Sequence, residues 1–211
     1  MTANPHLSRP VHRFGASSAV AVAVVVHGRA QDPAWMREHL LDRLPPLPVA
    51  YLAPEAADGS WYPARFMEPL AANEPWLSWT LARIDTIVEE AVAGGVDRSR
   101  LALVGFSQGA CSILEYCARH PARYGAVVGL TGGLIGPPGT TWPGDSLDGT
   151  PVFLGTSDVD EWVPLLRVEE TADVLRQRGA DVDLVVYEGM GHDICDDEAA
   201  ATGRLLAALV R

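Results

Sequence analysis

The pentapeptide Gly105-Phe106-Ser107-Gln108-Gly109 constrains this chain more than any other stretch. It follows the apolar run 101–104, which is typical of a buried strand, and it opens a segment with apolar residues at the spacing of one helix face. A serine on a sharp strand-to-helix turn between glycines is a nucleophile elbow, G-x-S-x-G. Side chains at the two glycine positions would collide with the neighbouring strand and helix. The motif alone is common, so the rest of the chain must decide whether this serine is catalytic.

Apolar runs and helical patterns alternate along the whole chain, which predicts a single doubly wound α/β domain over residues 1–211 with a mostly parallel sheet. We expect a loose tail at residues 1–9 and two long loops, 54–75 and 132–150. The second loop shows no helical pattern that could form a lid. The predicted strands are 11–14, 19–26, 49–53, 101–104, 126–130, 152–154 and 182–187. The predicted helices are 33–44, 77–93, 108–120, 164–178 and 196–210.

Composition narrows the classes of partner. The formal net charge of −11 argues against a nucleic-acid partner, whose phosphates require Lys and Arg. Three cysteines, an odd number, argue against a framework of disulfides and predict a reducing compartment. The cysteines also lack metal-binding spacing, so we expect a protein without metal or cofactor. The longest apolar run, 19–26, is too short to span a bilayer. We therefore expect a cytoplasmic protein without stable membrane anchoring, and leave open whether it forms a homodimer.

Residues that could act as nucleophile, base or acid directly follow several of the predicted strands. The loops after the strands of a parallel sheet lie together, at its carboxyl ends. A serine nucleophile needs a base, and the base needs a carboxylate that fixes its tautomer. Ser107, then Asp158 or Asp160, then His192 follow the chain order of α/β-hydrolases. His27 precedes the serine, and we interpret it as an anchor of its own turn. The remaining histidines lie before the sheet core, within the first helix or at the far end of the elbow helix: His6, His12, His39 and His120.

The residues alone leave the acid open. Asp158 is nearer the end of its strand, whereas Asp160 stands at the start of a D-x-x-V-P segment that opens the next helix. Whichever of the two is not the acid is expected to cap that helix or to hold the loop.

Four motifs together resemble the phospholipase/carboxylesterase family of small α/β-hydrolases. They are His27-Gly28, the elbow with Ala110, the segment 160–164 and Gly189-Met190-Gly191-His192. The chain is most similar to a bacterial branch with an HGR-x-Q motif, here residues 27–31, and a Trp-Tyr-Pro loop, here residues 61–63.

The resemblance implies Ser107 as the nucleophile, His192 as the general base and then acid, and Asp160 as the orienting acid. It also implies an oxyanion hole from the backbone N–H groups of Arg29 and Gln108. Whether the side chain of Arg29 shapes the substrate site is left open.

The aromatic residues of the first long loop are candidates for a pocket wall. We interpret Trp61, Tyr62 and Phe66 in this way, with an aromatic plug over the core as the alternative. Trp142 and Trp162 are weaker candidates.

The expected function is hydrolysis of a small-molecule carboxylic ester of short to medium acyl length through an acyl-enzyme. A lysophospholipase and an acyl-protein or acyl-CoA thioesterase are close alternatives. An acyltransferase and a catalytically silent small-molecule binder are alternatives of other classes.

Overall fold

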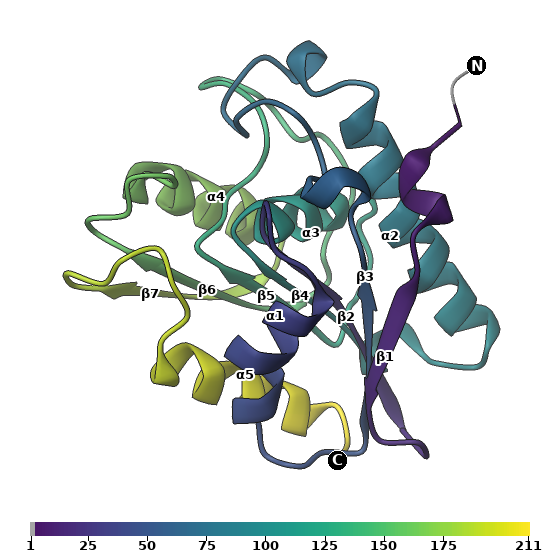
Figure 1. Ribbon diagram of the computed structural model, residues 1–211. Helices are drawn as coiled ribbons and strands as arrows, with labels where there is room; N and C mark the ends of the chain where they lie inside the picture. The colour runs from purple at the N-terminus through teal and green to yellow at the C-terminus, as the bar shows by residue number, and fades with distance from the viewer. Residues whose placement is uncertain (1–2) are drawn as a thin grey trace.

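The computed structural model describes residues 3–211, which form one seven-stranded sheet with helices on both faces (Figure 1). The strand order is β1-β3-β2-β4-β5-β6-β7. The strands are β1 (Val11–Gly15), β2 (Ala21–Val26), β3 (Val49–Pro54), β4 (Leu101–Phe106), β5 (Ala126–Leu130), β6 (Pro151–Ser157) and β7 (Asp181–Tyr187). The α-helices are α1 (Pro33–His39), α2 (Trp76–Ala93), α3 (Gln108–Arg119), α4 (Leu165–Gln177) and α5 (Asp196–Ala208).

The sheet is parallel except at one edge, where β1 pairs antiparallel with β3. Strands β2, β4 and β5 are buried at every residue, as continuous apolar runs without alternation require. The predicted doubly wound, mostly parallel sheet is confirmed. Strands β2, β4, β6 and β7 run in one direction, so the loops that follow them all lie at the carboxyl ends of the parallel strands.

Each face of the sheet has its own hydrophobic core. One core joins the sheet to α2, α3 and α4, and includes Leu81, Leu114 and Leu175. The other joins it to α1 and α5, and includes Met36 and Leu206. Figure 1 shows α1 and α5 on one side and the other three helices opposite.

Some element bounds differ from the prediction. The first helix ends at His39 rather than near 44, because Leu40 leaves helical geometry at φ −130° and ψ −60°. A short 3-10 turn, Leu41–Arg43, follows it and keeps Leu41 buried. Strand β6 runs to Ser157, three residues beyond its predicted end, so its carboxyl end is closer to Asp158 and Asp160.

The predicted loose tail is wrong for the residues that the structure describes. Pro5–Ser8 forms a 3-10 helix, and His6 is fully buried. Nε2–H of His6 donates to Trp61 O at 3.1 Å, and its Nδ1 accepts from Ala57 N–H at 3.1 Å. Residues 1 and 2 of the predicted tail lie outside the described residues.

The loop between β5 and β6 contains no helix within the described residues, as expected, but it is firmly held. The buried carboxylate of Glu115 on α3 accepts from Ile135 N–H at 3.0 Å and from Trp142 Nε1–H at 2.9 Å. From α4, the guanidinium of Arg167 donates to Leu134 O and Gly136 O. The indole of Trp142 therefore helps to hold this loop against α3.

Candidate active site

The elbow places Ser107 at the tight junction of β4 and α3. Ser107 has φ 53° and ψ −120°, a backbone conformation that residues other than glycine rarely adopt. A Cβ on Gly105 would lie 2.6 Å from the backbone of Gly109, and one on Gly109 would lie 2.1 Å from Val26 O at the end of β2. Both glycines are thus required for the serine to stand half-buried at the helix N-terminus.

A continuous chain of hydrogen bonds links Ser107 to His192 and Asp160. His192 Nε2 lies 2.8 Å from Ser107 Oγ, and His192 Nδ1 lies 2.7 Å from Asp160 Oδ2. The three side chains come from the loops after β4, β7 and β6. This distribution explains how residues 85 positions apart in the sequence meet at one edge of the sheet. The arrangement can accept a proton from the serine hydroxyl at one imidazole nitrogen and stabilise the resulting imidazolium at the other.

Asp160, and not Asp158, is the carboxylate next to His192. The other oxygen of Asp160, Oδ1, accepts from the backbone N–H groups of Trp162 and Val163 at 2.8 and 2.9 Å. Asp158 instead accepts from Gly189 N–H at 2.7 Å, which ties the loop after β6 to the loop that carries His192.

The environment of Asp160 favours its charged form. Burial raises the pKa of this carboxyl, but the hydrogen bonds from His192, Val163 and Trp162 outweigh burial, so the pKa is lowered from 3.8. Asp160 is therefore an anion at neutral pH that can hold the Nδ1–H tautomer of His192.

Two backbone N–H groups of the pocket lining are available to a ligand, one at the elbow and one in the turn after β2. The N–H of Arg29 donates to no acceptor within residues 3–211, and the N–H of Gln108 is the first of α3, where no acceptor lies one turn back. Both residues line the same pocket as Ser107. Gln31 Oε1 accepts from Gly28 N–H at 2.9 Å and so fixes the turn that presents Arg29.

His27 anchors this turn, as the sequence indicated. Its Nδ1–H donates to Gly28 O at 2.7 Å, and its Nε2 accepts from Ala56 N–H at 3.1 Å. Burial lowers the pKa of His27, so the neutral imidazole is favoured.

The aromatic loop forms the pocket wall only in part. Tyr62 and Phe66 line the pocket, but Trp61 does not. Trp61 is fully buried, donates from Nε1 to His27 O at 2.8 Å, and packs between the rings of His6 and His27. For Trp61 the alternative of an aromatic plug over the core is therefore the better interpretation, because its indole N–H donates to the buried backbone of His27.

Gln108 joins the elbow to this loop. Its side chain accepts from Trp61 N–H at 2.9 Å and donates to Tyr62 O at 2.8 Å. The side chain of Arg29 holds the same loop through bonds from Nη2 to Tyr62 O at 2.8 Å and Ala64 O at 3.0 Å.

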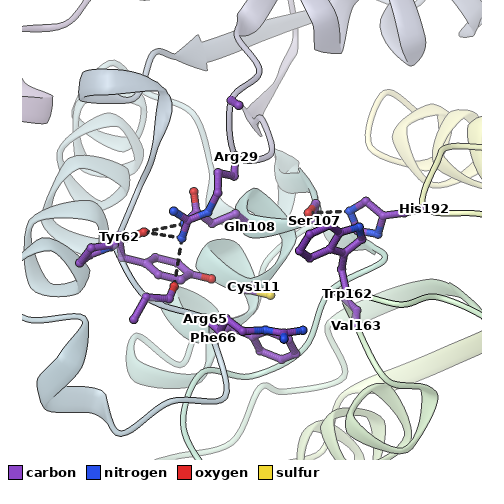
Figure 2. A pocket seen from close by; sticks show the side chains of 13 residues that line it. Arg29, Tyr62, Arg65, Phe66, Ser107, Gln108, Cys111, Trp162, Val163 and His192 are labelled. Atoms are coloured by element: carbon purple, nitrogen blue, oxygen red, sulfur yellow. Dashed lines mark hydrogen bonds between the residues drawn. The ribbon is translucent and has the colours of Figure 1, made fainter.

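The pocket has a volume of about 470 Å³ and opens beside Ser107 and His192 (Figure 2). Trp162, a weaker candidate from the sequence, also lines the pocket, and so do Arg65 and Cys111, which the sequence patterns did not single out. Helical spacing could have identified Cys111, which lies one turn after Ser107. Burial raises the pKa of the Cys111 thiol to about 11, so this sulfur is protonated at neutral pH and is a poor competing nucleophile.

No helix within residues 3–211 is both long and apolar enough to cross a membrane. Within the same residues, no group of three His, Cys, Asp or Glu side chains is placed to hold a metal ion.

Comparison with known proteins shows which family the chain belongs to. The sequence model of the phospholipase/carboxylesterase family matches residues 43–209. A solved phospholipase/carboxylesterase from Dyadobacter fermentans is 35% identical and superposes with a TM-score of 0.86 over 94% of this chain and 96% of that one. A carboxylesterase from Mesorhizobium loti, 21% identical, shares the fold with a TM-score of 0.75 over 94% of each chain.

Among curated proteins, acyl-protein thioesterase 1 of Gibberella zeae is 24% identical over 87% of this chain and 88% of its own length. The family match covers well over half of the chain, and the fold agrees with it. The protein belongs to the phospholipase/carboxylesterase family of α/β-hydrolases and is an enzyme of that hydrolase class.

Proposed function

We propose that the protein hydrolyses carboxylic esters of short to medium acyl length through an acyl-enzyme on Ser107. The observation that carries this proposal is the hydrogen-bond chain from Ser107 through His192 to Asp160. A serine hydroxyl is a weak nucleophile at neutral pH, and a base at 2.8 Å removes this limitation.

In the acylation step, Ser107 Oγ attacks the ester carbonyl while His192 Nε2 takes its proton. The carbonyl oxygen becomes an oxyanion, to which the N–H groups of Arg29 and Gln108 donate, assisted by the N-terminus of α3. His192 then gives the proton to the departing alcohol, which leaves an acyl group on Ser107.

In the deacylation step, water takes the place of the alcohol. His192 removes a proton from the water, the resulting hydroxide attacks the acyl carbonyl, and the carboxylic acid leaves as Ser107 recovers its proton. Asp160 stays ionised throughout and stabilises the imidazolium.

The pocket supports the shorter acyl groups. Its volume of about 470 Å³ lies in the lower part of the range of about 300–1,000 Å³ for small-molecule sites. The buried side chains of Tyr62, Phe66 and Cys111 line it, and within the described residues the loop between β5 and β6 carries no helix that could act as a lid. Each methylene that the pocket buries should add about 0.8 kcal/mol to binding, and the gain should stop when the chain protrudes.

A thioesterase is the second candidate, favoured by the similarity to proteins named acyl-protein thioesterase. The same triad and oxyanion hole would cleave a thioester, with a thiol as the leaving group.

The proposal is tested with p-nitrophenyl esters and the matching acyl-CoA thioesters of graded acyl length. We expect kcat/KM on the esters to rise over the first few carbons and then to fall. The Ser107→Ala variant should lose about 10⁶ in kcat. A preference for thioesters at every length would favour the second candidate, and near-normal turnover by Ser107→Ala would overturn both.

A further inference from the structure

The pocket carries unbalanced positive charge. Its lining includes two arginines, Arg29 and Arg65, and no Asp or Glu. The triad carboxylate of Asp160 lies behind His192, where its oxygens already accept three hydrogen bonds. The positive lining is unexpected because the chain as a whole has 27 acidic residues against 16 basic ones.

Arg65 is an exposed cation at the rim of the pocket. Its guanidinium carbon lies over the ring of Trp162, 6.0 Å from the ring centre, and both side chains line the pocket (Figure 2). Within residues 3–211 it forms no ion pair with any carboxylate, including that of Glu68, whose N–H bonds to the backbone of Arg65. The charge of Arg65 is therefore available to a ligand.

Arg29 is held so that it keeps free donors. Both of its side-chain hydrogen bonds come from Nη2, which donates to Tyr62 O and Ala64 O. Guanidinium has five N–H groups, and those on Nε and Nη1 donate to no acceptor within the described residues. The two bonds fix the orientation of the guanidinium, which lowers the entropy lost when it binds an anion.

We propose that the pocket selects esters that carry an anionic group, a carboxylate or a phosphate, on the acyl or the alcohol part, with Arg65 and Arg29 as the residues that recognise it. The inference rests on the proposed ester hydrolysis and names its substrate class. Arginine forms charge-assisted, bidentate bonds to such groups, whereas a neutral ester leaves both cations unpaired. The net negative charge of the protein should repel anions elsewhere on its surface, which makes the local site selective.

Two matched substrate pairs separate the possible positions of the anion. Monomethyl adipate and methyl hexanoate differ only at the far end of the acyl chain, while 3-acetoxypropyl phosphate and butyl acetate differ at the end of the alcohol. Proton release measured in a pH-stat gives kcat and KM for each. We expect at least one anionic member to exceed its neutral partner about tenfold in kcat/KM, mainly through a lower KM. The preference should shrink when salt rises from about 50 mM to about 500 mM.

Substitutions assign the preference to the pocket. Arg65→Gln should reduce the anionic-to-neutral ratio at least about fivefold, which corresponds to about 1 kcal/mol. The matched control is Arg13→Gln on β1, which makes the same change in net charge at an exposed position outside the pocket and should leave the ratio unchanged. Equal or better hydrolysis of the neutral member in both pairs, or an unchanged ratio in Arg65→Gln, would overturn the inference.

Calorimetry on the Ser107→Ala variant tests recognition without turnover. Tighter binding of monomethyl adipate or of 3-acetoxypropyl phosphate than of its neutral partner, weakened by Arg65→Gln, supports the inference even if no ester is cleaved. In that case the proposed hydrolysis alone would fail. Equal binding of the members in both pairs would contradict the inference.

Discussion

Asp158 and Asp160 are two residues apart but bond to different partners, and this difference assigns them different roles. Asp160 faces His192 at 2.7 Å, whereas Asp158 binds Gly189 N–H and joins two loops. Asp160→Asn should lower kcat about 10⁴-fold, because an amide can favour the wrong imidazole tautomer. Asp158→Asn is the matched control and should lower kcat much less. Steady-state kinetics on one ester compares them, and a larger loss in Asp158→Asn would contradict the assignment.

A second residue-scale prediction concerns Glu198, a buried carboxyl at the start of α5. Burial raises its pKa from 4.5 to about 7, although its Oε2 accepts from Cys195 N–H. Its Oε1 has no partner within the described residues. The folded state therefore binds this proton between pH 4.5 and about 7, where the unfolded chain releases it.

The consequence is a loss of stability as pH rises through that window. The contribution of the protonated carboxyl to the free energy of unfolding is full below pH 4.5 and is lost by pH 7 and above. The loss should be on the order of 3 kcal/mol or less. Glu198→Gln keeps an acceptor for Cys195 but cannot ionise, so urea unfolding from pH 4.5 to 8 should show the gap between the two proteins changing in favour of the variant. Parallel pH profiles would contradict the raised pKa.

At the scale of elements, the docked 3-10 helix at residues 5–8 fastens the chain start to the aromatic loop. His6→Ala removes partners of Trp61 O and Ala57 N–H and should lower the free energy of unfolding by about 1–3 kcal/mol. Leu7→Ala, at an exposed neighbour, should change it by less than about 0.5 kcal/mol. Urea denaturation measures both, and equal small effects would show that this segment contributes nothing.

The elements whose form depends on local pattern could be predicted from the sequence. The run 101–104 and the glycines at 105 and 109 indicated the strand, the turn and the helix of the elbow, because each depends on neighbours in the chain. The end of α1 could not be predicted, since Leu40 is a good helix former and the helix stops where Leu41 must turn into the core.

The same limit applies within the candidate site. The order of Ser107 and His192 along alternating strands was enough to pair them. The buried position of Trp61 depends on His6 and His27, which approach it from distant segments, so the aromatic pattern of its loop could not separate it from Tyr62. The residues alone left Asp158 and Asp160 open, because the choice depends on backbone N–H groups that only the folded loop presents. The family resemblance, and not the local pattern, implied Asp160.

At the scale of the whole molecule, the parallel sheet brings the parts of the site together. Strands β2, β4, β6 and β7 end at one edge, and they deliver the turn at Arg29, the serine, the carboxylate and the imidazole. Both cores on the two faces of the sheet fix these strand ends. The site therefore depends on the register of the sheet. The two arginines of the pocket lining differ in sign from the net charge of the chain, which is −11.

The most direct test of the central claim is intact-mass spectrometry after treatment with a fluorophosphonate, followed by peptide mapping. A serine activated by His192 should react once, so the account predicts a single adduct, located on Ser107 and absent from Ser107→Ala. The His192→Gln variant should label far more slowly, because the hydroxyl loses its base. Absence of an adduct on the folded protein, or an adduct on another residue that persists in Ser107→Ala, would contradict the claim that Ser107 is the nucleophile.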